Sequence, residues 1–103
     1  MTAVEIQNLL VEYGALIKSL KKDIAKAKSQ KEIDALGNGA IGIIYSLNII
    51  KPLAPLILSE RLDYWYKEWY HQIIRAMLNR AIDIGLPASD INKLYSLGRV
   101  DIA

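Results

Sequence analysis

The chain has 103 residues, of which 52% are hydrophobic and 23% are charged, and its formal net charge is +2. A chain of this length makes a single domain, residues 1–103, with one modest core. The absence of cysteine excludes disulfides, a thiolate nucleophile and cysteine-ligated zinc or iron–sulfur sites. The net charge is too small to indicate nucleic-acid binding by itself.

Residues 2–28 predict a long amphipathic helix. Thr2 and Glu5 have the spacing of a capping box. Large apolar residues then recur at alternating steps of four and three, namely Ile6, Leu10, Tyr13, Ile17, Leu20 and Ile24. Such a stripe is typical of a helix in a bundle or coiled coil. The stripe fades after Ala27, so we expect the helix to end between Lys28 and Lys31.

The lysines of this segment are unevenly distributed. Residues 18–31 contain six lysines against one acidic residue, Asp23. Lys18, Lys22 and Lys26 fall on the face opposite the apolar stripe. Such a face is usually solvated, but copies of the chain side by side would repeat it as a positive strip suited to phosphates.

A nearly uncharged segment runs from Ala35 to Ser59, with Lys51 as its single charge. A short helical turn at residues 31–36 is expected to end in a break at Gly37-Asn38-Gly39, since these residues tolerate positive φ. Residues 40–50 are apolar on every side and predict a buried helix, because no partner strand is found elsewhere. Pro52 and Pro55 then mark a kink or short connection.

Neither a signal peptide nor a clear transmembrane helix is predicted. The N-terminus lacks a basic start, and Glu5 and Glu12 interrupt its apolar pattern. The best uninterrupted apolar stretch, residues 40–50, is shorter than the about 20 residues that a spanning helix needs. A buried core helix or an interfacial hairpin is therefore favoured over a span.

The next segment predicts a long aromatic-rich helix that runs to Ile84. Ser59 is a candidate N-cap, the acidic pair Glu60 and Asp63 suits the positive end of a helix, and Gly85 ends it. The first half places Leu62, Trp65, Tyr66, Trp69 and Ile73 on one face. The second half is apolar round about two thirds of its circumference. One helix cannot cover that surface, so we expect two or more neighbours, with another subunit as a candidate.

The last element expected is a short helix, capped by Ser89 or Asp90 and running to Leu97, with Gly98 after it. The predicted fold class is therefore all-α. It is a small helical bundle with a long N-terminal helix, an apolar central helix, a long aromatic-rich helix and a short C-terminal helix.

No catalytic constellation is apparent. Residues 37–42 match G-x-G-x-x-G, but residues 31–36 are a poor strand and the chain is too short for a doubly wound sheet. His71 is the only histidine, and the nearest carboxylates, Glu68 and Asp63, lie on its own helix, so no metal set or triad can be assembled. We expect no enzymatic activity, no cofactor, no metal and no small-molecule substrate.

The aromatic cluster of the long helix has three interpretations. It comprises Tyr64, Trp65, Tyr66, Trp69 and Tyr70. The cluster is favoured as core or subunit contact. The alternatives are a belt at a membrane interface and a stacking platform for nucleic-acid bases.

Residues 81–99 fit the helix-turn-helix template, with small and apolar residues around Gly85. This segment resembles the Cro repressors of phages through Ala81, Asp83, Gly85, Ser89, Ile91, Asn92, Lys93, Gly98 and Arg99. By that resemblance Ser89, Asn92 and Lys93 would face base edges, and Arg99 would lie near a phosphate. One functional hypothesis is therefore a dimeric helix-turn-helix DNA-binding regulator.

The chain as a whole is small, cysteine-free and rich in Ile, Tyr and Lys. It has an apolar hairpin at residues 40–58, followed by the aromatic-rich residues 64–84. In these respects it resembles the helical-bundle coat proteins of archaeal spindle-shaped and rod-shaped viruses. The resemblance implies a bundle that self-assembles and wraps double-stranded DNA, and a virion or cytoplasmic location.

The leading hypothesis is a self-assembling structural protein, a viral coat subunit whose partners are copies of itself and double-stranded DNA. Lys18, Lys22 and Lys26 would face the enclosed DNA or solvent. A further alternative is a membrane-surface protein that inserts residues 40–58 into lipid. The candidate subunit-interface residues are Ile41, Ile44, Leu47, Trp65, Trp69 and Ile73.

Overall fold

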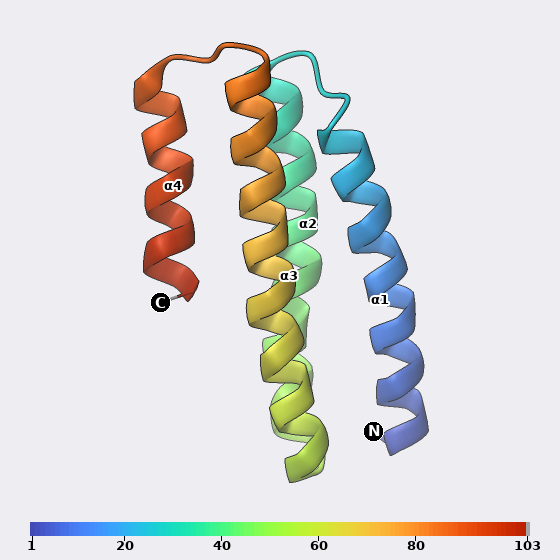
Figure 1. Cartoon of the computed structure of the whole chain (residues 1–103). Coiled ribbons are helices and arrows are strands. Elements are labelled where there is room, and N and C mark those ends of the chain that lie inside the picture. Colours follow the sequence, from blue (N-terminus) through green and yellow to red (C-terminus); the bar gives the residue numbers. More distant parts are fainter. Residues whose placement is uncertain (103) are drawn as a thin grey trace.

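The computed structural model consists of four α-helices and one short 3-10 turn (Figure 1). It describes residues 1–102, with the side chains of residues 1–96. The helices are α1 (Ala3–Ile24), α2 (Gln30–Ile50), α3 (Leu56–Asp83) and α4 (Ala88–Ile102), and the turn η1 (Lys51–Leu53) links α2 to α3. No strand occurs within residues 1–102, which confirms the predicted all-α bundle.

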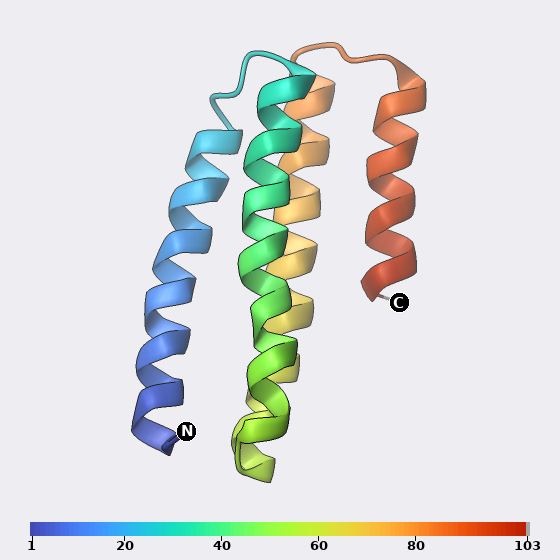
Figure 2. The same cartoon turned by 180° about the vertical axis from the view of Figure 1, so that it is seen from behind.

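Successive helices run antiparallel, and the molecule is flat. α1 packs against both α2 and α3, whereas α4 lies against α3 on the side away from α1 (Figures 1 and 2). The principal extents are 45 × 25 × 14 Å. The N-terminus lies at the same end as η1, which we call the hairpin end, and the other two connections lie together at the opposite end, the loop end (Figure 1).

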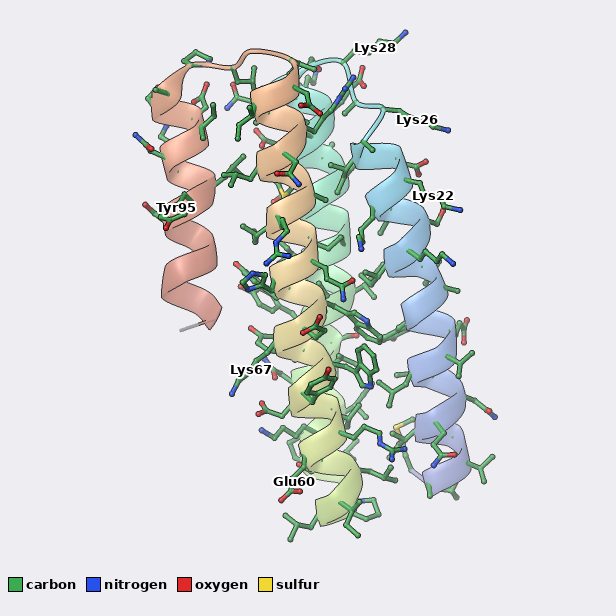
Figure 3. The ribbon with its side chains drawn as sticks, in the orientation of Figure 1. Lys22, Lys26, Lys28, Glu60, Lys67 and Tyr95 are labelled. Carbon is green, nitrogen blue, oxygen red and sulfur yellow. The ribbon has the colours of Figure 1, made fainter. Side chains whose placement is uncertain are left out.

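Helix α1 begins as predicted. The Thr2 hydroxyl accepts a hydrogen bond from the Glu5 N–H at 3.2 Å, and the Glu5 carboxylate accepts one from the Thr2 N–H at 3.1 Å. This reciprocal pair is a capping box and satisfies two backbone donors at the helix start. The predicted stripe is buried at four of its six positions and half-buried at the other two. The lysines of the outer face, including Lys22, point away from α3 (Figure 3).

The end of α1 differs from the prediction. The helix stops at Ile24, before the expected Lys28 to Lys31. Ala27 in the following turn is only 2% exposed, and its carbonyl accepts a hydrogen bond from Arg80 Nε at 2.7 Å. This long-range contact with α3 turns the chain earlier than the local apolar pattern indicates.

The predicted break at residues 37–39 is wrong, because α2 is continuous from Gln30 to Ile50. Its start is set by Ser29, whose hydroxyl accepts a hydrogen bond from the Glu32 N–H at 3.2 Å. Gly37 lies inside the helix, where a Cβ would collide with Sδ and Cε of Met77 on α3. Glycine here therefore serves close helix packing and not a turn.

Residues 40–50 are helical as predicted, but only one side of this segment is buried. Ala40, Ile44 and Leu47 are at most 1% exposed, whereas Tyr45 is 45% and Ile49 is 74% exposed. Within the described residues, the segment Gln30–Leu53 is the one candidate long and apolar enough to cross a membrane, with 28% of its most apolar window buried. A core helix of a soluble protein meets the same criterion.

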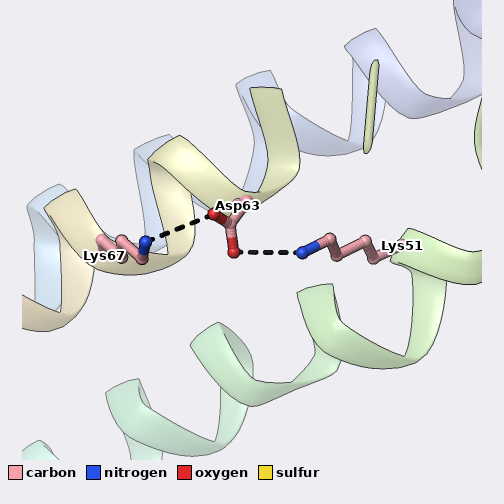
Figure 4. Close-up of polar contacts among 3 residues, drawn as sticks. All are labelled: Lys51, Asp63 and Lys67. Carbon is pink, nitrogen blue, oxygen red and sulfur yellow. Dashed lines mark hydrogen bonds and ion pairs between the residues drawn. The ribbon is translucent and has the colours of Figure 1, made fainter. Parts of the chain in front are cut away.

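The start of α3 also differs from the prediction. The cap is Pro55 and not Ser59, whose N–H donates to the Pro55 carbonyl at 2.8 Å within the first turn. The first turn contains no acidic residue, so the helix dipole does not explain the acidic pair. Asp63 instead forms ion pairs with Lys51 at 3.2 Å and with Lys67 at 3.4 Å (Figure 4).

The end of α3 is close to the prediction. Gly85 has a φ of +73°, a left-handed conformation that glycine adopts without strain. The Leu86 N–H donates to the Ala81 carbonyl at 3.0 Å, and the Gly85 N–H donates to that of Ile82 at 3.1 Å. These two bonds form a Schellman motif.

Helix α4 begins earlier and ends later than predicted. It starts at Ala88, because the Asp90 and Ile91 N–H groups both donate to the Pro87 carbonyl, so neither Ser89 nor Asp90 is the cap. The helix continues through Gly98 to Ile102. A glycine inside a helix costs about 1 kcal/mol relative to alanine, which is too little to end it by itself.

The wide apolar surface of α3 is covered by its own chain. Ile73, Met77 and Ala81 are at most 3% exposed, and α3 packs against α1, α2 and α4. The prediction that two or more neighbours are needed is confirmed. Another subunit is not required, since α4 covers the side that α1 and α2 leave open.

Candidate functional site

Most of the predicted subunit-interface residues lie in the core of a single chain. Ile44, Leu47 and Ile73 are at most 1% exposed, and Trp69 is 5% exposed. Ile41 and Trp65 are half-buried against the same core. In this single chain the four buried residues pack against one another in the core, and their contact with another subunit stays a prediction.

A different set of apolar side chains is exposed at the hairpin end. Ile49 is 74%, Leu53 61%, Leu56 76% and Ile57 76% exposed, and we call these four residues the hairpin tip. Ile49 lies in the last turn of α2, Leu53 is the last residue of η1, and Leu56 and Ile57 begin α3, so all four lie at the hairpin end (Figure 1). A cluster of large aliphatic side chains at one end of a small protein indicates a contact surface.

Further exposed apolar residues lie on other parts of the surface. Val4 is 66% and Val11 75% exposed on α1. Ile82 on α3 is 54% and Tyr95 on α4 is 55% exposed (Figure 3). Single exposed apolar residues are common, but together with the hairpin tip they place apolar area on more than one side of the molecule.

The aromatic cluster divides into two groups in the structure. Trp65 and Trp69 face α1, with ring centroids 5.2 Å apart. Tyr66 and Tyr70 instead face α2, where their rings stack on Tyr45 at 6.0 and 6.2 Å. Both groups pack between helices of one chain, which is the core arrangement that the sequence favoured.

A shallow groove runs between α1 and α3. Its half nearer the hairpin end has a volume of about 700 Å³ and is lined by Gly14, Arg61, Trp65 and Trp69, among others. Its half nearer the loop end has a volume of about 320 Å³. Gln72 lines both hollows, so they adjoin at that residue, and we call the two together the α1–α3 groove.

The loop-end half of the groove is cationic. Its charged lining residues are Lys21, Arg75, Arg80 and one carboxylate, Asp83. Sequence reasoning missed this arrangement, because it placed the positive charge on the outer lysine face of α1. Helical spacing could have indicated part of the groove. Arg80 lies about two helical turns after Gln72 on the same helix, so the two side chains point to a similar side.

Each cation of the loop-end half is hydrogen-bonded to an acceptor that carries no negative charge. Lys21 Nζ donates to Gln72 Oε1 at 3.3 Å, and Arg75 Nη2 donates to His71 Nε2 at 2.9 Å. Arg80 donates to the Ala27 carbonyl, as described above. Among the described residues the ion pairs are those of Asp63 at the hairpin end, so the groove cations are not neutralised by a contacting carboxylate.

The residues predicted to read DNA share the exposed side of α4. Ser89, Asn92 and Lys93 are exposed, and the side chain of Arg99 lies outside the described residues. The helices α3 and α4 lie antiparallel, side by side (Figures 1 and 2). The two helices of a helix-turn-helix unit cross at about 90–120°, so this pair has a different geometry.

The other sequence motifs form no site. All three glycines of the G-x-G-x-x-G match lie within α2, so they form no loop before a helix N-terminus. Within the described residues no group of three or more His, Cys, Asp or Glu side chains is placed to hold a metal ion. No protein-family model matches the chain, and no curated protein or solved structure matches it.

Proposed function

We propose that this protein is a non-enzymatic structural subunit that assembles with copies of itself through the hairpin tip. The observation that carries the proposal is the exposure of 61% to 76% at all four tip residues. Their own chain leaves these side chains in water, although it buries neighbouring apolar residues of the same helices such as Leu47 and Leu58. A coat subunit that forms a filament or shell is the narrower form of this proposal.

The energetics favour several contacts for each copy. Burying one exposed Leu or Ile side chain contributes about 1.5–3 kcal/mol, whereas association costs about 4–15 kcal/mol in lost freedom. Full burial of the four tip side chains would contribute about 6–12 kcal/mol, which is similar to that cost, so a tip contact alone gives a pair of marginal stability. Val4 and Val11 supply a second apolar surface, and contacts between two different surfaces repeat from copy to copy into rings or open polymers.

A second copy fits the tip better than a bilayer does. The buried side of α2, with Ile33 and Ile44 at 0% exposure, holds the bundle together, so a membrane-spanning α2 would lose its core contacts. The charged residues Lys51 and Asp63 lie beside the tip, which limits any insertion into lipid to a shallow one.

Light scattering coupled to size exclusion, over a series of concentrations, tests the proposal. The wild-type protein is expected to grow in mass with concentration and to form regular particles in electron micrographs. The variant Leu56→Asp/Ile57→Asp should stay monomeric, and it should fold, because acidic residues are favourable in the first turn of a helix. The control Asn38→Asp/Asn92→Asp adds the same charge at exposed positions and should assemble like the wild type.

The outcomes separate the rival functions. A monomer at every concentration, or assembly that the tip variant does not change, contradicts self-assembly through the tip. Flotation of the monomer with liposomes, lost in the tip variant, would instead support the membrane-surface function.

A DNA-binding regulator that reads duplex DNA with α4, without the crossing angle of a helix-turn-helix unit, is a second candidate, supported by the exposure of Ser89, Asn92 and Lys93 on α4. It predicts sequence-specific binding of duplex DNA in a gel-shift series. Asn92→Ala should then weaken base preference by about 1–3 kcal/mol. Duplex binding without sequence preference, or none, contradicts this function.

A further inference from the structure

We propose that the groove between α1 and α3 binds single-stranded nucleic acid, with phosphates at Lys21, Arg75 and Arg80 and an unpaired base at Trp65. This inference goes beyond the proposed function and does not depend on it. The groove and the hairpin tip are separate surfaces, so one can be disabled without the other.

The charge of the groove selects an anionic ligand. Three cations line its loop-end half against a single carboxylate, Asp83, and Arg61 adds a cation to the other half. Glu68 lies beside the groove, where it accepts a hydrogen bond from Gln72 at 3.1 Å. The excess of positive charge therefore lies in the loop-end half of the groove.

The cations keep donors for such a ligand. Arg80 uses Nε for the Ala27 carbonyl, and a guanidinium has four further N–H donors in a planar fork that matches phosphate. Lys21 donates to one amide oxygen, and an ammonium group carries three donors. These hydrogen bonds hold the side chains at the groove without cancelling their charge.

The shape of the groove selects a linear chain. Its lining residues on α3 extend from Arg61 to Asp83, a length of about 33 Å at the helical rise of 1.5 Å per residue. Small residues keep it open, namely Gly14 and Ala25 on the α1 side and Ala76 on α3. A polyanion of several units fits this length, whereas a single phosphate would occupy one part of it.

The tryptophans select an unpaired base. Trp65 is half-buried in the groove wall between Tyr64 and Trp69, at centroid distances of 5.1 and 5.2 Å. Aromatic side chains beside a positively charged groove are the common elements of single-strand binding sites. A duplex hides its base faces by pairing and stacking, so it cannot make the Trp65 contact.

Fluorescence anisotropy with a labelled thymidine 12-mer tests the proposal, at protein concentrations where the wild type is monomeric. Three phosphate contacts predict a slope of about −2 for log K against log salt, since each contact contributes about −0.7 on single strands. Binding should also quench the intrinsic tryptophan fluorescence.

The groove variant Lys21→Gln/Arg75→Gln should lower affinity by about tenfold or more at low salt and reduce the slope to about −0.7. Its matched control, Lys22→Gln/Lys93→Gln, removes the same charge from exposed positions outside the groove and should bind nearly as the wild type does. Trp65→Leu should weaken binding about fivefold or more, and Trp65→Phe should restore most of the loss. Thermal melts establish that each variant is folded.

Several results would overturn the proposal. Absence of binding at low salt would do so, as would equal losses in the groove variant and its matched control. Duplex DNA that binds as tightly as the single strand, with the same dependence on Lys21 and Arg75, would show a general phosphate site and contradict the single-strand assignment. Unchanged affinity in Trp65→Leu would likewise contradict the single-strand assignment.

Discussion

The two ends of the α2–α3 pair differ in how their apolar residues are covered. Near the loop end, Met77 packs directly onto Gly37, with no room for a Cβ between the helices. At the hairpin end, Leu56 and Ile57 are each 76% exposed. The nearly uncharged segment, residues 35–59, therefore does not have one environment. Its residues are buried only where α1 or a close helix crossing covers them.

The largest difference in stability should separate two truncations in α2, one of a buried isoleucine and one of an exposed isoleucine. Ile44 is 0% and Ile49 is 74% exposed. We expect Ile44→Ala to lower the free energy of unfolding by about 2–5 kcal/mol, because it removes transfer energy and leaves a cavity. Ile49→Ala should change it by no more than about 0.5 kcal/mol. Urea unfolding followed by circular dichroism measures both, and similar losses would contradict the burial assigned to α2.

The next effect concerns the close crossing at Gly37. Gly37→Val should destabilise the protein by about 1–3 kcal/mol, because the added atoms overlap the Met77 side chain and force α2 and α3 apart. In a double-mutant cycle, Met77→Ala should relieve part of this cost. Additive losses would show that the two residues are not in contact.

A smaller effect of opposite sign is expected two residues away. A Cβ at Gly39 would meet nothing within 4 Å, although Gly39 lies in the same helix. Gly39→Ala should therefore stabilise the protein by about 0.5–1 kcal/mol through helix propensity. A rise in the thermal midpoint would support a continuous helix through Gly39. A fall in the midpoint would instead support the break predicted at residues 37–39.

The smallest effect is a pH dependence at the hairpin end. The hydrogen bond from Lys51 holds the pKa of the Asp63 carboxyl below its ordinary value of 3.8. The folded state therefore favours the carboxylate, so its stabilising contribution is present above the unfolded pKa and is lost as pH falls through the folded one. The pair is 40% and 37% exposed, which limits the effect to about 0.5 kcal/mol.

Urea unfolding of the wild type and of Asp63→Asn measures this contribution. The wild type should be the more stable protein at about pH 6, and the difference should shrink as the pH falls below the ordinary pKa of 3.8. Asp34→Asn serves as the control, since Asp34 forms no ion pair among the described residues. An equal difference above and below this pKa would contradict a role for the charge of Asp63.

Local signals predicted the helix boundaries only where they acted without tertiary contacts. The capping box at Thr2 and the glycine stop at Gly85 are both present, because each is made by residues adjacent in sequence. The end of α1 was misplaced, since Arg80 from α3 binds the turn at Ala27. The start of α3 was misplaced because Pro55, without a side-chain hydrogen bond, precedes the first turn.

The candidate sites were less predictable than the fold. The pattern identified Trp65 and Trp69 as packing residues and also assigned them to subunit contact, whereas in the structure both line the groove between α1 and α3 of one chain. The cationic groove combines Lys21 with Arg75 and Arg80, and their proximity depends on how α1 docks on α3. Helical periodicity gives the direction of each side chain about its own axis and says nothing about which helix lies opposite.

The sequence by itself determined the all-α fold class, because apolar stripes, caps and stop residues act locally. Only the tertiary structure decided which apolar residues are core and which are surface, and that Gly37 is a packing contact and not a turn. The physical reason is that burial depends on covering atoms, which come from helices distant in sequence. The hairpin tip and the α1–α3 groove are the two surfaces that this packing leaves for partners.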